Sequence, residues 1–149
     1  MSDTPVQGGC LCGAVRYTIA PASALGLAEA CHCSRCRRGS GSAASAHVVV
    51  EAAALQVDGL QALRTWQASP RRQRQFCGNC GSPLFIRRAG AEHLVVLAMG
   101  SLDGEPPVRL QRHVFCDSAA GWDPLRAGDE GPGDGLPRYR IYPGCEPDD

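Results

Sequence analysis

The sequence Cys31-His-Cys-Ser-Arg-Cys36 places three thiols on one short segment. Two further clusters flank it, Cys10-Leu-Cys12 and Cys77-Gly-Asn-Cys80, and together the clusters hold seven of the nine cysteines. Thiolates at such spacing converge on one soft cation, for which zinc is the usual choice in proteins. Because a structural zinc takes four ligands, seven thiolates predict one complete site and one three-thiolate site with an open position.

The two outer clusters are predicted to form the complete zinc site, with the ligands Cys10, Cys12, Cys77 and Cys80. Each pair is followed directly by a glycine, Gly13 or Gly81. Glycine accepts positive φ, which lets the backbone turn tightly around a metal. Such a site would join the start of the chain to a strand some 65 residues later. A metal that closes so long a loop supports a small hydrophobic core.

Cys31, Cys33 and Cys36 are predicted to hold the second zinc, whose fourth position could take water, a substrate thiol or another side chain. Three thiolates donate strongly and make the zinc a softer Lewis acid than three histidines would. This ligand set favours binding and activating a thiol over generating hydroxide. The expected chemistry is addition of a thiol to a small carbonyl compound, or the reverse cleavage of a carbon–sulfur bond.

The surroundings of the second cluster offer candidates for substrate binding. Arg35, Arg37 and Arg38 could hold the carboxylates of a ligand, because guanidinium binds carboxylate in a bidentate manner. The same arginines could equally form a solvated face. His32 lies between two predicted ligands, and its side chain is expected to point away from the metal.

Two cysteines lie outside the clusters, Cys116 and Cys145. Either one could complete a second four-thiolate site, and both zincs would then be structural. In that alternative the protein is a zinc-stabilised protein-binding module without catalysis. Cys116 also fits a buried, small apolar residue that follows a strand.

Composition limits the remaining classes of function. The chain has 149 residues, typical of one domain, and 15 arginines but no lysine balance 15 acidic residues. Zero net charge and few aromatic residues disfavour nucleic acid as a partner. The N-terminus lacks a basic and apolar leader, and no apolar run reaches membrane-spanning length. We therefore expect a cytoplasmic protein with reduced thiols and no membrane partner; a homodimer is left open.

Short β-like runs separated by glycine-rich turns predict a mainly β domain of small antiparallel sheets with metal-bearing loops. The one expected helix covers residues 23–30. Residues 124–137 are rich in glycine and proline, which indicates a long surface loop before an acidic tail. We expect a single domain over residues 1–149 with a core at about 8–123, followed by the loop and tail at 124–149.

With their neighbours, the three cysteine motifs resemble the glutathione-dependent formaldehyde-activating enzyme (GFA) family, which shares its domain with centromere protein V. The matching residues are 9–17, 31–42 and 76–85, with weaker matches at 100–103, at 113–115 and at Trp122. The resemblance covers about residues 8–123.

The resemblance implies an Mss4-like fold of β-sheets around a structural zinc. It assigns the structural zinc to Cys10, Cys12, Cys77 and Cys80, and a catalytic zinc to Cys31, Cys33 and Cys36. It also implies two zincs per chain and a carbon–sulfur lyase that forms S-(hydroxymethyl)glutathione from formaldehyde and glutathione. The substrates would be a glutathione-like thiol and a small aldehyde.

Overall fold

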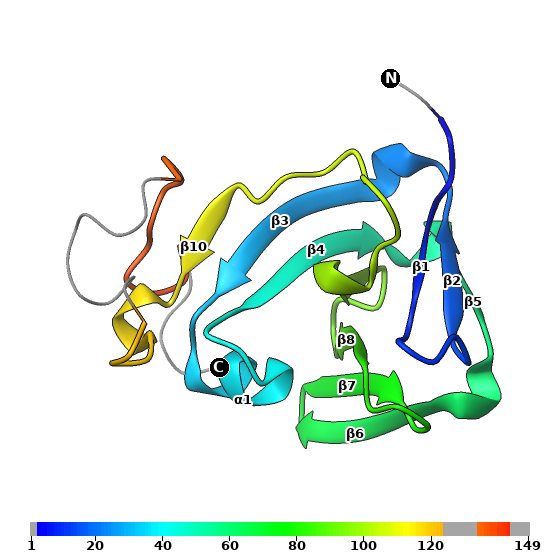
Figure 1. Cartoon of the computed structure of the whole chain (residues 1–149), viewed down its shortest axis with the longest axis horizontal. Helices are drawn as coiled ribbons and strands as arrows, with labels where there is room; N and C mark the ends of the chain where they lie inside the picture. Colours follow the sequence, from blue (N-terminus) through cyan, green and yellow to red (C-terminus); the bar gives the residue numbers. More distant parts are fainter. Residues whose placement is uncertain (1–2, 124–133, 144–149) are drawn as a thin grey trace. The chain divides into compact units, whose positions relative to one another are not determined.

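The computed structural model describes residues 3–123 and 134–143, which fold into two compact units (Figure 1). The first unit contains residues 1–27 and 48–108, and the second contains residues 28–47 and 109–149. The first unit contains both outer cysteine clusters, and the second contains the central cluster. The predicted loop and tail lie largely outside the described residues. The single domain over the whole chain stays a prediction.

A three-stranded antiparallel sheet opens the first unit. It has the order β1 (Val6–Gly9), β2 (Arg16–Ile19) and β5 (Leu55–Asp58). Strand β2 alternates half-buried and buried residues because successive side chains point to opposite faces of a sheet. Its buried face carries Tyr17 and Ile19 into the core of the unit.

A second sheet has seven strands in the order β10-β3-β4-β9-β8-β7-β6. The bounds are β3 (Leu25–Cys31), β4 (Ser45–Glu51), β6 (Leu63–Ser69), β7 (Arg72–Cys77), β8 (Pro83–Arg88), β9 (Leu94–Ala98) and β10 (Arg112–Val114). Strands β6 to β9 form an antiparallel meander in the first unit. In the second unit β10 pairs with β3 in parallel. Short 3₁₀ turns at Ala22–Ala24, Ala52–Ala54, Leu60–Ala62, Met99–Ser101 and Cys116–Ser118 link several elements.

The core of the first unit is made of aliphatic and aromatic side chains from both sheets. Leu84 and Phe85 of β8 and Val95 and Leu97 of β9 are at most 2% exposed. The ring of Tyr17 meets that of Phe85 edge-on, with centroids 5.5 Å apart. This dry core makes the unit a rigid support for the cysteines at its turns. The prediction of a mainly β protein with antiparallel sheets is confirmed.

The predicted helix at residues 23–30 is wrong. The segment forms a 3₁₀ turn and then β3, in which Ala28 and Ala30 are buried. These alanines suggested a helix, but their neighbours in the sheet decide the conformation. The α-helix that the structure does describe is α1 (Ser34–Ser40), in a segment expected to be a loop. Residues 138–142 form a single bridge, between Arg138 and His113, and no strand.

Candidate metal centres

The structure brings together the sulfur atoms of Cys10, Cys12, Cys77 and Cys80. The first pair lies in the turn between β1 and β2. In the second pair, Cys77 is the last residue of β7 and Cys80 lies in the turn that follows. Gly13 (φ 79°) and Gly81 (φ 77°) adopt the left-handed conformation that the sequence predicted. No atom outside their chain neighbours would lie within 4 Å of an added Cβ. Backbone conformation, not lack of space, is what selects glycine here.

Ser82 connects the two turns of this four-cysteine cluster. Its hydroxyl accepts a hydrogen bond from the backbone N–H of Leu11 (3.0 Å) and lies 3.2 Å from Cys80 Sγ. The backbone N–H of Val15 donates to Cys10 Sγ at 3.2 Å. These bonds favour the ionised sulfurs that a metal requires. Sequence analysis did not single out Ser82.

Zinc fits the geometry of the four-cysteine cluster. Zinc–sulfur bonds of about 2.3 Å in a tetrahedron place neighbouring sulfurs about 3.8 Å apart. The Sγ–Sγ distance is 3.6 Å between Cys10 and Cys12 and 3.7 Å between Cys12 and Cys77. Four sulfurs at this spacing form a closed donor set.

Without a bound cation, ionisation of one thiol in this cluster disfavours ionisation of its neighbours. Hydrogen bonds from the hydroxyl and then the backbone of Ser82 lower the pKa of Cys80 to about 5. The backbone N–H of Ala14 lowers the pKa of Cys12, but burial and the neighbouring thiols outweigh it and raise the value to about 11. A divalent cation would remove this competition by binding every sulfur in the thiolate form.

The structure also groups the sulfurs of Cys31, Cys33 and Cys36 within 4.8 Å of one another. Cys31 ends β3, and Cys33 is the N-cap of α1, where its sulfur accepts a hydrogen bond from the backbone N–H of Cys36 at 3.3 Å. Val114, Phe115 and Tyr142 pack against the cluster. The sulfur donors and the spacing suit a soft cation, and the set has one ligand fewer than a closed tetrahedral site.

The pKa values of neighbouring thiols differ still more widely in the three-cysteine cluster. Hydrogen bonds from the thiols of Cys31 and Cys36 lower the pKa of Cys33 to about 2. The contact of Cys31 with the thiol of Cys33, and then its contact with Cys36, raise the pKa of Cys31 far above its ordinary value. These contacts favour ionisation of Cys33 over that of Cys31.

A chain of polar side chains lies beside the three-cysteine cluster. His32 is 4% exposed, and its Nε2 lies 2.9 Å from Nδ1 of His113. Nε2 of His113 lies 2.7 Å from a carboxylate oxygen of Asp134. The backbone N–H of Leu136 and then the contact with His113 lower the pKa of Asp134, which keeps this carboxylate ionised. We call these three side chains the histidine chain.

The carboxylate assigns the direction of the hydrogen bonds along the histidine chain. Asp134 accepts from His113 Nε2–H, so Nδ1 of a neutral His113 accepts from His32 Nε2–H. Nδ1 of His32 is then a buried acceptor without a hydrogen-bond partner among the described residues. An oxygen of Asp123 lies 3.7 Å from it, beyond hydrogen-bond distance. Burial and then the neighbouring His113 lower the pKa of His32 and favour its neutral form.

The other residues that the sequence suggested for a site differ in their surroundings. His32 bonds to His113 and is not part of the sulfur group, as expected. Arg35 and Arg38 are exposed, whereas Arg37 is half-buried and its Nε atom is enclosed without a hydrogen-bond partner among the described residues. Cys116 lies outside both groups, and Cys145 lies outside the described residues. Asp134 was not predicted to belong to a site, and His113 was part only of a weak motif match.

The protein is thus mainly β, with a four-sulfur and a three-sulfur cluster that could each hold a metal ion. The family model of the glutathione-dependent formaldehyde-activating enzyme matches residues 5–118, and the chain belongs to this family. Its fold is similar to the crystal structure of a Rhodobacter sphaeroides protein studied in structural genomics. That match has 26% identity and a TM-score of 0.53, and covers 68% of this chain and 91% of the other. No curated protein matches the chain. The helix in the described residues is too short to cross a membrane.

Proposed function

We propose that the protein is a zinc-dependent enzyme of the carbon–sulfur lyase type that joins a glutathione-like thiol to a small aldehyde such as formaldehyde. The observation that carries this proposal is the three-sulfur cluster at Cys31, Cys33 and Cys36 in a chain that also has a complete four-sulfur cluster. Three protein ligands leave one position for a substrate, as in catalytic zinc sites. Membership of the family supports the thiol and aldehyde as substrates.

The four-cysteine cluster would hold a structural zinc and the three-cysteine cluster a catalytic one, which gives two zincs per chain. Bound at the second cluster, zinc supplies a positive charge that favours the thiolate form of a substrate thiol near neutral pH. The many reduced cysteines that this function needs agree with a cytoplasmic location.

The side chains around the second cluster would orient the thiol and limit its contact with water. Val114, Phe115 and Tyr142 pack against the cluster and would reduce its contact with water. Among the three arginines of α1, Arg37 is the strongest candidate to bind a substrate carboxylate, because its enclosed Nε–H needs an acceptor. The histidine chain would fix the position of His32 and so of the two cysteines beside it.

The proposed reaction balances without a further reagent. The thiolate sulfur attacks the carbonyl carbon, a carbon–sulfur bond forms, and the carbonyl electron pair moves to oxygen. The oxygen then takes up a proton, which replaces the one that the thiol released. The product is a hemithioacetal, S-(hydroxymethyl)glutathione when the substrates are glutathione and formaldehyde, and the reverse reaction returns both.

Cys33→Ala tests this proposal, with Cys116→Ala as the matched control outside both clusters. We expect zinc content to fall from two to one per chain in Cys33→Ala, and the protein-dependent exchange between ¹³C-formaldehyde and its glutathione adduct to disappear in NMR exchange spectra. Cys116→Ala should keep both. If Cys33→Ala loses its zinc but the wild type never accelerates the exchange, the protein-binding alternative replaces the enzyme.

A further inference from the structure

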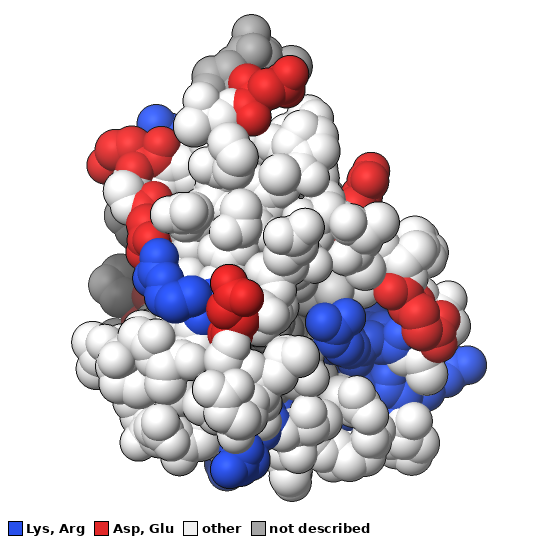
Figure 2. Space-filling view, turned by 90° about the vertical axis from the view of Figure 1, so that its right-hand side faces the viewer, with Lys and Arg blue, Asp and Glu red and all other residues white. Residues whose placement is uncertain are grey.

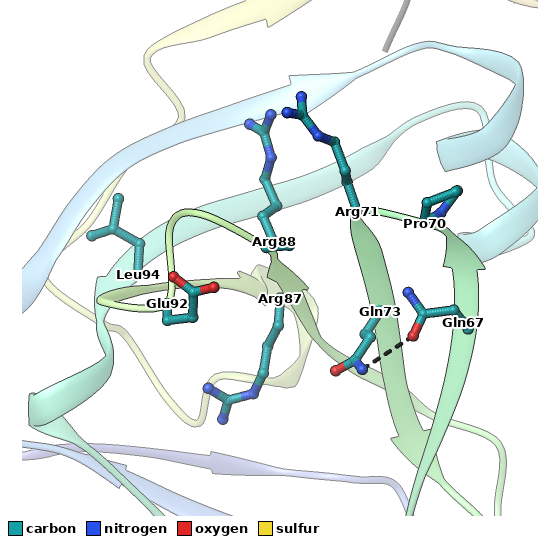
Figure 3. Close-up of a pocket in the computed structure, with 9 residues that line it drawn as sticks. Gln67, Pro70, Arg71, Gln73, Arg87, Arg88, Glu92 and Leu94 are labelled. Atoms are coloured by element: carbon teal, nitrogen blue, oxygen red, sulfur yellow. Dashed lines mark hydrogen bonds between the residues drawn. The ribbon is translucent and has the colours of Figure 1, made fainter.

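A cavity of about 360 Å³ lies at the end of the β7–β8 hairpin in the first unit (Figure 3). Its wall includes Arg71, Arg87 and Arg88, the amides of Gln67 and Gln73, and Glu92. The volume is within the range of small-metabolite sites. The lining is unusual for such a site because it is dominated by charge, which points to an ionic ligand.

Arg71 lies in the turn just before β7, and Arg88 is the last residue of the neighbouring strand β8. Arg88 is paired with Arg72, and the backbone N–H of Ala89 donates to the carbonyl of Arg71 at 2.9 Å. In Figure 3 both side chains extend in the same direction, and Arg87 extends the opposite way. Two like charges held close together repel each other, and an anion bound between them would attract both.

Neither guanidinium of this pair has a partner of its own in the described part of the chain. No carboxylate there lies within 4.0 Å of Arg71 or Arg88. Arg87 differs, because its Nε donates to the amide oxygen of Gln75 at 2.9 Å. Figure 2 shows one face of the molecule, on which some basic side chains lie beside acidic ones.

Glu92 is the acidic residue in the cavity wall, and its carboxylate is engaged elsewhere. One of its oxygens accepts the backbone N–H of Gly90 at 2.8 Å. This bond and a second one to its own backbone lower the pKa of Glu92. Glu92 therefore closes the turn after β8 as a carboxylate. It forms no ion pair with Arg71 or Arg88, so both guanidinium groups can bind an anion.

We propose that Arg71 and Arg88 form a binding site for a compact dianion, the phosphate or dicarboxylate group of a small metabolite. Two planar guanidinium forks match the paired oxygens of either group, and each offers several N–H donors. The site is distinct from both cysteine clusters and does not depend on the proposed catalytic function. It gives the first unit a ligand of its own in addition to its proposed structural metal.

The test is a titration of the zinc-loaded full chain with inorganic phosphate, and separately with malonate, at constant ionic strength. The Nε–Hε resonances of the arginines are followed by NMR. We expect saturable shifts at Arg71 and Arg88, and at least about tenfold weaker binding in Arg71→Gln and Arg88→Gln. A response to phosphate alone assigns the ligand as a phosphate, and one to malonate alone assigns a dicarboxylate. A response to both assigns a site that recognises the charge of either group.

Arg64→Gln is the matched control. It removes the same charge from the same unit, but its guanidinium already donates to the carbonyl of Gln61 at 2.8 Å. Equal weakening in this variant would show a general charge effect and overturn the site. Shifts that never saturate with either anion would overturn it as well. Circular dichroism establishes that each variant is folded.

Discussion

The two cysteine clusters have the same chemistry but different construction. The four-cysteine cluster joins two turns, with Cys12 and Cys77 separated by 65 positions in the chain. The three-cysteine cluster comes from one continuous segment, in which a strand ends at Cys31 and a helix begins after Cys33. The first is closed by its own sulfurs, whereas the second is supported by the histidine chain and an apolar wall.

This difference in construction favours different roles for the two clusters. A metal that links distant segments restricts the unfolded chain strongly, because loop-closure entropy grows with the length of the loop. A metal held by one short segment restricts the unfolded chain much less. The local cluster can therefore leave a position open for a substrate at a small cost in stability.

The largest effect is expected for Cys77→Ser. By the relation used for covalent cross-links, a closed loop of this length is worth on the order of 4 kcal/mol. Loss of the metal should lower the free energy of unfolding by a comparable amount, and zinc content should fall with it. Urea unfolding and elemental analysis measure the two quantities, with Cys116→Ser as the control. Unchanged stability with full zinc content would refute the structural role of this cluster.

Stepwise removal of metal should distinguish the clusters in the unmodified protein. A mild chelator is expected to take zinc first from the three-cysteine cluster, which has an open position for the competing ligand. That step should cost at most about 2 kcal/mol, the value that the same relation gives for a six-residue segment. Removal of the second equivalent should cause the larger loss. Simultaneous release of both metals would contradict two independent sites.

Asp134→Asn tests the support of the three-cysteine cluster. The amide keeps the shape of the carboxylate but weakens the hydrogen bond to His113 and no longer fixes its direction. Loss of a group that is hydrogen-bonded to a metal ligand usually lowers metal affinity about 10-fold to 100-fold. Asp134 acts more indirectly, through His113 and His32, so we expect a loss of at most about 10-fold. Competition with a chromophoric chelator measures the affinity, and the spectrum of the cobalt-substituted protein reports the ligand geometry.

Asp117→Asn is the control for this experiment, since Asp117 pairs with Arg140 on the surface of the same unit at 2.9 Å. It should leave both the affinity and the cobalt spectrum unchanged. If Asp134→Asn changes neither, the histidine chain has no influence on the metal ligands.

The sequence was sufficient for the features that depend on local spacing. The short Cys-x-Cys and Cys-x-x-Cys motifs and the glycines after them predict turns with converging sulfurs, and these turns are present at Gly13 and Gly81. Alternation in the strands also indicated the class of fold. Both kinds of pattern are set by neighbours within a few residues, so a single sequence contains them.

Features that depend on distant contacts could not be predicted. The helix α1 has only seven residues, no apolar repeat, and a cysteine sulfur as its N-cap, so none of the usual helix signals marks it. The contact between His32 and His113 joins positions 81 residues apart, and nothing near either histidine indicates the other. Asp134 was expected to lie in a surface loop. The parallel pairing of β10 with β3 brings His32 and His113 together, and the bridge between His113 and Arg138 brings the segment of Asp134 to them.

The smallest effect is expected for Tyr17→Phe, which tests whether the unit of the four-cysteine cluster also has a stabilising core of its own. The hydroxyl of Tyr17 lies 2.7 Å from Ser101 Oγ, and burial raises the pKa of Tyr17 to about 12. Loss of this hydrogen bond should cost about 1 kcal/mol at neutral pH. The raised pKa adds stability that is fully present below the unfolded value of about 10 and is lost as pH rises towards 12.

At pH 11 the wild type should therefore have lost about 1.4 kcal/mol of stability through Tyr17 relative to pH 8, whereas Tyr17→Phe should lack this contribution. Urea unfolding of both proteins at the two pH values measures the difference and cancels the titration of all other groups. An equal loss in both proteins would show that Tyr17 titrates normally. The core would then be open to water, and the four-cysteine cluster would have to supply a larger share of the stability of its unit.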